Sequence, residues 1–112
     1  MSSLSPEDNK LVVLARAARA RARAAEGAAL RDVDGRTYAA ATVDLPSLQV
    51  SAVGVAVAMA VASGAKGAEA IVVLTGEELG SNDVAIVREF AGSGVLLHRG
   101  SPAGLVEDTR QT

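Results

Sequence analysis

The longest apolar run of the chain covers residues 46–66 and is built mainly from alanine and valine. Alanine is the strongest helix former, Ser47 can cap a helix start, and Gly64 is the residue type that often follows a helix end. A helix that is apolar on all sides must be buried, so the pattern predicts a central helix packed against a sheet. The valines recur at the helical spacings of three and four: Val50, Val53, Val57 and Val61.

A membrane-spanning helix is the alternative for this run. Crossing a bilayer takes about 20 apolar residues, and residues 45–64 nearly reach that length. However, the run contains Gln49, Ser51 and Ser63, and the chain has one tyrosine, one phenylalanine and no tryptophan to form an aromatic belt. The sequence therefore favours a helix inside a protein core and predicts no membrane partner.

The first third of the chain predicts a helix followed by a hairpin. Ser5 can cap the helix, Pro6 suits its first position, and Gly27 marks its end. Residues 28–33 and 36–43 are then predicted as two strands. The pair Asp34-Gly35 between them indicates a two-residue turn in which both residues have positive φ.

The second half predicts a strand, a helix and a strand. Residues 68–75 include a continuous apolar run, which is typical of a strand buried on both faces of a parallel sheet. A helix capped by residues 81–83 follows, then a strand at 95–98 and a short last element at 105–112 with a loose polar tail. The element order predicts a three-layer α-β-α sandwich, a mixed sheet with helices on its faces. Residues 1–112 are expected to form a single domain.

Composition narrows the function classes. The chain has no cysteine, which excludes a disulfide framework and a thiolate metal site. A net charge of −2 does not point to nucleic acid or a membrane surface. The N-terminus is polar and acidic where a signal peptide would be basic and then apolar, so a cytoplasmic protein is predicted.

Three arginines share one side of the first predicted helix, namely Arg16, Arg19 and Arg23, while Arg21 stands apart from them. They indicate either a patch that binds phosphate or nucleic acid or the solvated face of an alanine-rich helix. The acidic chain and the lack of interleaved aromatic residues favour the solvated face and argue against nucleic acid.

Several short motifs, in this order and spacing, resemble the cytidine deaminase family over nearly the whole chain. They are Gly27-Ala28-Ala29-Leu30, Asp34-Gly35-Arg36-Thr37-Tyr38, Thr42-Val43-Asp44, Ala52 with Ala56, Ser63-Gly64 and Arg88-Glu89-Phe90. The resemblance implies that family's fold.

The resemblance also implies where the family's zinc site would fall. That family deaminates cytidine with zinc, held by a cysteine or histidine at one helix start and two cysteines at the next, and with a glutamate that moves protons. The ligand positions here hold Ser51, Gly80 and Asp83, and the glutamate position holds Val53. Asp44 stands where the family contacts ribose. By this resemblance the zinc cofactor is expected to be absent, and no catalytic or metal residue is predicted.

The leading hypothesis is a non-catalytic protein of this fold that acts through self-association, as a dimer or tetramer, or through a protein partner or ligand. The alternative is an active cytidine or nucleoside deaminase with an atypical site, in which His98, Asp44 and Asp83 would be the ligands to suspect. A third reading is a module that binds a nucleoside or nucleotide in a remnant cleft where two helix N-termini favour an anion. The cleft residues would be Asp44, Ser51, Ser81, Asn82 and Asp83.

Overall fold

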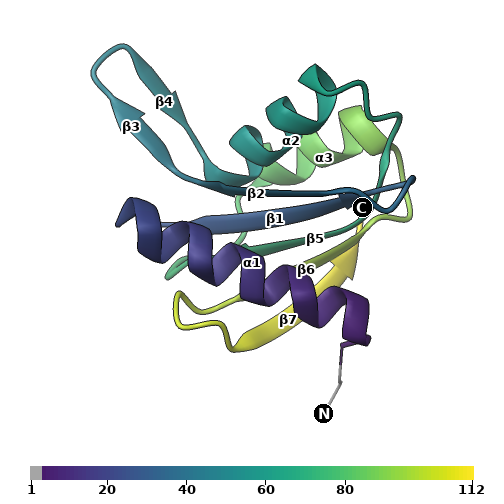
Figure 1. Ribbon diagram of the computed structural model, residues 1–112, viewed down its shortest axis with the longest axis horizontal. Coiled ribbons are helices and arrows are strands. Elements are labelled where there is room, and N and C mark those ends of the chain that lie inside the picture. Colours follow the sequence, from purple (N-terminus) through teal and green to yellow (C-terminus); the bar gives the residue numbers. More distant parts are fainter. Residues whose placement is uncertain (1–3) are drawn as a thin grey trace.

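A computed structural model describes residues 4–112 and contains three helices and two sheets. Residues 1–3, part of the N-terminal segment considered above, lie outside the described residues. The five-stranded sheet has the order β2-β1-β5-β6-β7, and β3 and β4 form a separate hairpin that projects from one end of the molecule (Figure 1). The elements are α1 (Pro6–Ala22), β1 (Gly27–Asp32), β2 (Thr37–Ala41), β3 (Val43–Leu45), β4 (Leu48–Val50), α2 (Ala52–Ala62), β5 (Ala68–Leu74), α3 (Ser81–Ala91), β6 (Leu96–Gly100) and β7 (Val106–Gln111).

The predicted three-layer α-β-α sandwich is confirmed. Helix α1 covers one face of the sheet, with Leu11 and Ala15 packed on Val72 and Leu74. Helices α2 and α3 cover the other face (Figure 1), where the larger core cluster includes Val53 and Val57. Strand β5 lies in the middle, and every residue of it except Glu69 is buried. Among the strand pairs of this sheet within residues 4–112, only β5 and β6 run parallel, so the sheet is mixed as expected.

The prediction of one helix across residues 46–66 was wrong at its start. Pro46 and Ser47 form the turn of the β3–β4 hairpin, in which Leu45 pairs with Leu48. The helix α2 begins at Ala52, and its N-cap is not Ser47 but Ser51, whose Oγ accepts the Gly54 N–H at 3.1 Å. Pro46 disfavours helical backbone in the residue before it, Leu45, and this favours a strand and turn over a helix at this point. The spacing of Val50 matched the helix only by chance.

The β1–β2 turn differs from the predicted two-residue hairpin because Gly35 alone has positive φ, at 87°. Residues 33–36 separate the two strands. The buried Asp32 organises them: its Oδ1 accepts the N–H groups of Asp34 and Arg36, each at 2.9 Å, and its Oδ2 accepts the Tyr38 hydroxyl at 2.9 Å. Burial alone would raise the pKa of Asp32, but these hydrogen bonds outweigh it and lower the pKa below its usual value.

Two further boundaries differ from the sequence prediction. Helix α1 ends at Ala22, not at Gly27, and Arg23 caps it in a left-handed conformation with φ of 52°. Gly27 instead opens β1 at a point where α1 lies very close: a Cβ placed on it would sit 2.2 Å from the Ala15 carbonyl oxygen. The C-terminal residues are not a loose tail, since Val106–Gln111 pairs with β6 as the edge strand β7.

Within residues 4–112, no helix has the length and apolar character that a bilayer crossing requires.

Candidate functional site

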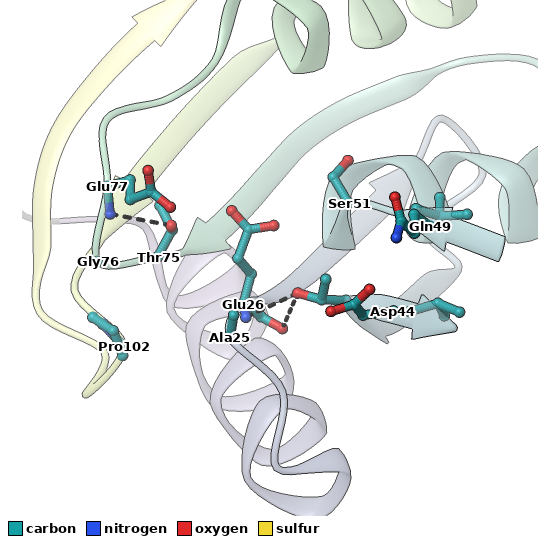
Figure 2. A pocket seen from close by; sticks show the side chains of 12 residues that line it. Ala25, Glu26, Asp44, Gln49, Ser51, Thr75, Gly76, Glu77 and Pro102 are labelled. Atoms are coloured by element: carbon teal, nitrogen blue, oxygen red, sulfur yellow. Dashed lines mark hydrogen bonds between the residues drawn. The ribbon is translucent and has the colours of Figure 1, made fainter. Parts of the chain in front are cut away.

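An open cavity of about 680 Å³ lies where β5 ends and α2 begins (Figure 2). Such a position beside the carboxyl end of a central strand is where open α/β sheets commonly bind ligands. Three carboxylates line the cavity, those of Glu26, Asp44 and Glu77, and no lysine or arginine is among its lining residues. The lining therefore offers hydrogen-bond acceptors and negative charge to whatever enters it.

The five residues predicted for a remnant cleft are only partly brought together. Asp44 and Ser51 line the cavity, Asp44 from the β3–β4 hairpin and Ser51 from the start of α2. Asp83 does not line it but is bonded to Ser51. Ser81 and Asn82 are exposed in the first turn of α3 and are not among the lining residues.

Ser51 connects the starts of two helices. Its hydroxyl donates a 2.7 Å hydrogen bond to Asp83 Oδ1 and accepts the Gly54 N–H at 3.1 Å. Asp83 lies in the first turn of α3, whose N-cap Gly80 provides no side-chain cap. A carboxylate at a helix N-terminus is stabilised by the helix dipole. The Asp83 carboxylate thus supplies the negative charge that a bound anion was expected to bring to these helix starts.

Glu26 is the cavity residue that sequence reasoning missed. Its carboxylate lies at the start of α2, where Oε1 accepts the Ala52 N–H at 3.4 Å, and its side chain extends into the middle of the cavity (Figure 2). The Glu26 N–H donates to Thr42 Oγ1 at 2.9 Å, which fixes the segment between α1 and β1. The only sequence signal was its position directly before Gly27, where the resemblance to the cytidine deaminase family begins.

The residues at the helix starts do not fit a zinc ion. Zinc in proteins takes histidine nitrogen, cysteine sulfur or carboxylate oxygen, with three or four such protein ligands. Gly80 has no side chain, Ser51 is a hydroxyl, and the Asp83 carboxylate already accepts the hydrogen bond from Ser51. Across residues 4–112, no three histidine, cysteine, aspartate or glutamate side chains come together as a metal site would require.

His98, the lone histidine, belongs to a buried network under α1. Its Nε2 lies 2.8 Å from Asp8 Oδ2 and its Nδ1 lies 2.8 Å from Thr109 Oγ1, while Arg31 Nη2 lies 2.9 Å from Asp8 Oδ1. Burial raises the pKa of Asp8, but the bonds from His98 and Arg31 more than offset it and lower that pKa. The network joins α1 to β1, β6 and β7, so His98 serves the fold on the face away from α2.

Comparison with known proteins gives a consistent picture. A model of the cytidine deaminase-like family matches residues 4–104. Among curated proteins, no sequence matches this chain.

Several solved structures share the fold. The cytidine deaminase of Burkholderia pseudomallei is 23% identical, with a TM-score of 0.77 over 97% of this chain and 92% of that one. The cytidine deaminase of Mycobacterium leprae is 19% identical, with a TM-score of 0.75 over 96% and 94%. That of Mycobacterium tuberculosis is 23% identical, with a TM-score of 0.72 over 83% and 85%. At these identities the likeness establishes the fold.

Proposed function

The chain belongs to the cytidine deaminase-like family, and we propose that within this family it acts by binding and self-association rather than by deamination. The observation that carries this proposal is the 2.7 Å hydrogen bond between Ser51 and Asp83. It joins two positions at which the resembling enzymes hold zinc, so a direct contact between side chains takes the place of a metal-mediated one.

The chemistry of deamination supports the proposal. Hydrolysis of the amino group needs a metal-activated water and a carboxylic acid that moves protons. The position of that acid holds Val53, which is fully buried in the core. Glu26 is another carboxylic acid in the cavity, and its carboxylate accepts the Ala52 N–H at the start of α2.

Self-association is proposed because α2 presents an apolar outer face. The helix carries no charged residue from Ala52 to Ala62, and Met59 and Val61 are 40% and 56% exposed. An exposed apolar patch on a small protein often marks an interface. Symmetric pairing of the same face of two copies is the commonest way to cover one, so we propose a homodimer or tetramer.

The experiment measures zinc, catalysis and mass together. Purified protein expressed in zinc-containing medium is assayed for bound zinc, for ammonia release from cytidine and deoxycytidine, and for molar mass by light scattering. The Mycobacterium tuberculosis cytidine deaminase is the positive control for the first two assays. We expect no stoichiometric zinc, no ammonia release and a mass of at least two chains. Stoichiometric zinc with turnover would overturn the non-catalytic proposal, and a clean monomer would overturn the self-association.

A second candidate is retention of a nucleoside in the cavity, favoured by the three carboxylates that could accept hydrogen bonds from sugar hydroxyl or base amino groups. The same carboxylates repel phosphate. Nucleosides, but not the matching nucleoside monophosphates, are therefore expected to raise the melting temperature. The variant Asp44→Asn should reduce that rise, and the absence of any rise at millimolar nucleoside would reject this candidate.

A further inference from the structure

The two edge strands of the five-stranded sheet, β2 and β7, differ in their side chains. Strand β7 carries Glu107, Asp108 and Arg110, all of them exposed. Charged side chains of this kind keep an edge from pairing with a further strand. Strand β2 reads Thr-Tyr-Ala-Ala-Ala and contains neither a charged residue nor a proline. The β2 edge therefore lacks the features with which proteins commonly protect an edge strand.

Half of the backbone groups of β2 face away from the sheet. The Thr42 N–H donates to the Glu26 carbonyl at 3.1 Å, and the Asp32 N–H donates to the Arg36 carbonyl at 2.8 Å. Bonded residues alternate along an antiparallel pair, so the even-numbered residues of β2 bond to β1. Three residues then present their N–H and C=O groups outward: Thr37, Ala39 and Ala41. Within residues 4–112 these outward groups have no backbone partner.

A second copy of β2 fits this edge. Thr37 and Ala41 lie two positions on either side of Ala39. In an antiparallel pair centred on Ala39, this residue lies opposite its own copy, and Thr37 lies opposite Ala41 in both directions. Such a contact is self-complementary, as a two-fold dimer requires. Every outward N–H and C=O group is then paired, which gives about six hydrogen bonds.

One side of helix α2 lies toward the β2 edge. The helix packs on β2 and β1 and beside α3, and α3 connects β5 to β6, on the far side of β1 from β2. Gly54 faces α3, since a Cβ placed on it would lie 3.9 Å from Ile86 Cδ1. Met59 comes five residues later, about 140° around the helix axis, and is 40% exposed. Met59 therefore lies on the side of α2 nearest the β2 edge.

The spacing of strands allows two copies of α2 to pack together in such a dimer. Neighbouring strands lie about 4.8 Å apart, so a helix centred between β2 and β1 lies about 4.8 Å from a two-fold axis between the two β2 strands. The two α2 helices would then lie about 10 Å apart, within the usual range for packed helices. Helix α2 has no charged residue from Ala52 to Ala62, so this packing buries no charge.

We infer that two copies of the chain join edge to edge through β2, so that the five-stranded sheet of one copy continues into that of the other. The α2 helices pack across the two-fold axis, with Met59 at their contact. This inference rests on the proposed self-association and adds to it the β2 edge, whose hydrogen bonds fix the orientation and register of the two copies.

Amide hydrogen exchange followed by NMR tests the pairing in the wild-type protein. If β2 is paired on both sides, the N–H groups of all residues from 37 to 41 exchange slowly. A free edge gives an alternating pattern, in which Tyr38 and Ala40 exchange slowly because they bond to β1, while Thr37, Ala39 and Ala41 exchange rapidly. The alternating pattern would overturn the inference.

The variant Ala39→Pro removes the central contact and keeps the monomer fold. The lost N–H faces outward, and proline is tolerated in an edge strand at such a position. Two hydrogen bonds are lost at the two-fold axis, so the dissociation constant of the dimer, measured by light scattering over a dilution series, should rise at least about 30-fold. The matched control is Gln111→Pro in β7. Its neighbour Thr112 donates its N–H to the Val95 carbonyl at 3.0 Å, so the Gln111 N–H faces outward, and the dissociation constant should not change.

The outcomes separate this inference from the proposed self-association. A monomeric wild type overturns both and would leave the β2 edge to a strand of a different protein. An oligomer that survives Ala39→Pro overturns the β2 contact alone, and equal weakening by both proline variants overturns it too. If Ala39→Pro does not fold, as judged by circular dichroism, the exchange pattern of the wild type decides.

Discussion

Ser51 Oγ and Asp83 Oδ1 are 2.7 Å apart, although 32 positions separate the two residues in the chain. This bond is the sole side-chain hydrogen bond found between α2 and α3 in the described residues. Because Ser51 also caps α2 through the Gly54 N–H, one hydroxyl fixes both the start of a helix and its neighbour. The contact therefore stabilises the corner of the fold beside the cavity.

Replacing Ser51 with alanine should destabilise the protein by about 1–2 kcal/mol, because the cap and the bond to Asp83 are lost together. Asp83→Ala should cost less, since the cap of α2 remains. The free energies of unfolding come from urea titration of the two single variants and the double variant, which should show coupling. The control is Ser81→Ala, at an exposed position with no side-chain cap bond. Additive effects of the two changes would mean that the bond contributes nothing.

Gly27→Ala should be among the most damaging single changes. A Cβ at this position would lie 2.2 Å from the Ala15 carbonyl oxygen and 2.7 Å from Arg19 Cβ, so α1 must move off the sheet. We expect a loss of about 3 kcal/mol, at the upper end for overpacking. The matched control is Gly67→Ala, whose Cβ would meet only Val33 Cγ1 at an ordinary 3.5 Å. Equal melting temperatures for the two variants would contradict the close approach of α1.

Arg23→Gly should stabilise the protein by about 1 kcal/mol, since an L residue in the left-handed region is strained by roughly that amount. For a chain of this size the melting temperature should rise by about 4 °C. The comparison variant Arg21→Gly lies inside α1, where glycine costs about 1 kcal/mol, so its melting temperature should fall. A fall for both variants would show that Arg23 is not strained.

Acid should destabilise the fold through Asp8 and Asp32. The pKa of each is lower in the folded protein than its usual value, so the unfolded chain binds protons more readily. The stability they contribute is therefore fully present above about pH 4 and is lost as the pH falls through the folded pKa values. Urea midpoints at several pH values between neutral and acid should show this loss. Asp8→Asn and Asp32→Asn should each flatten the pH dependence, and an unchanged pH dependence in both would contradict these assignments.

Local signals predicted much of the fold. Ser5 and Pro6 mark the start of α1 as expected, with the Asp8 N–H bonded to Ser5 Oγ at 3.1 Å. The apolar run of β5 indicated the buried central strand correctly. The β3–β4 hairpin was missed because its eight residues include apolar positions and lie directly before the apolar helix α2. The spacing of those positions fits the period of a helix as well as that of two paired strands. In this hairpin Leu45 and Leu48 are 56% and 52% exposed.

The candidate site was harder to predict, because its contacts join residues that are distant in the chain. The bond between His98 and Asp8 spans 90 positions, and that between Glu26 and Ala52 spans 26. No spacing rule places such pairs together. Asp44 and Ser51 were identified from the resemblance to the cytidine deaminase family, and both line the cavity. Glu26 matched no motif, and its role became clear only from the geometry at the start of α2.

The most direct test of the central claim is the zinc content of the purified, untagged protein expressed in zinc-containing medium. The residues at the starts of α2 and α3 do not make a zinc site, so we predict less than about a tenth of an equivalent per chain. Close to one equivalent, lost in the Asp83→Ala variant, would contradict the account and would show that the Ser51–Asp83 pair opens to hold a metal.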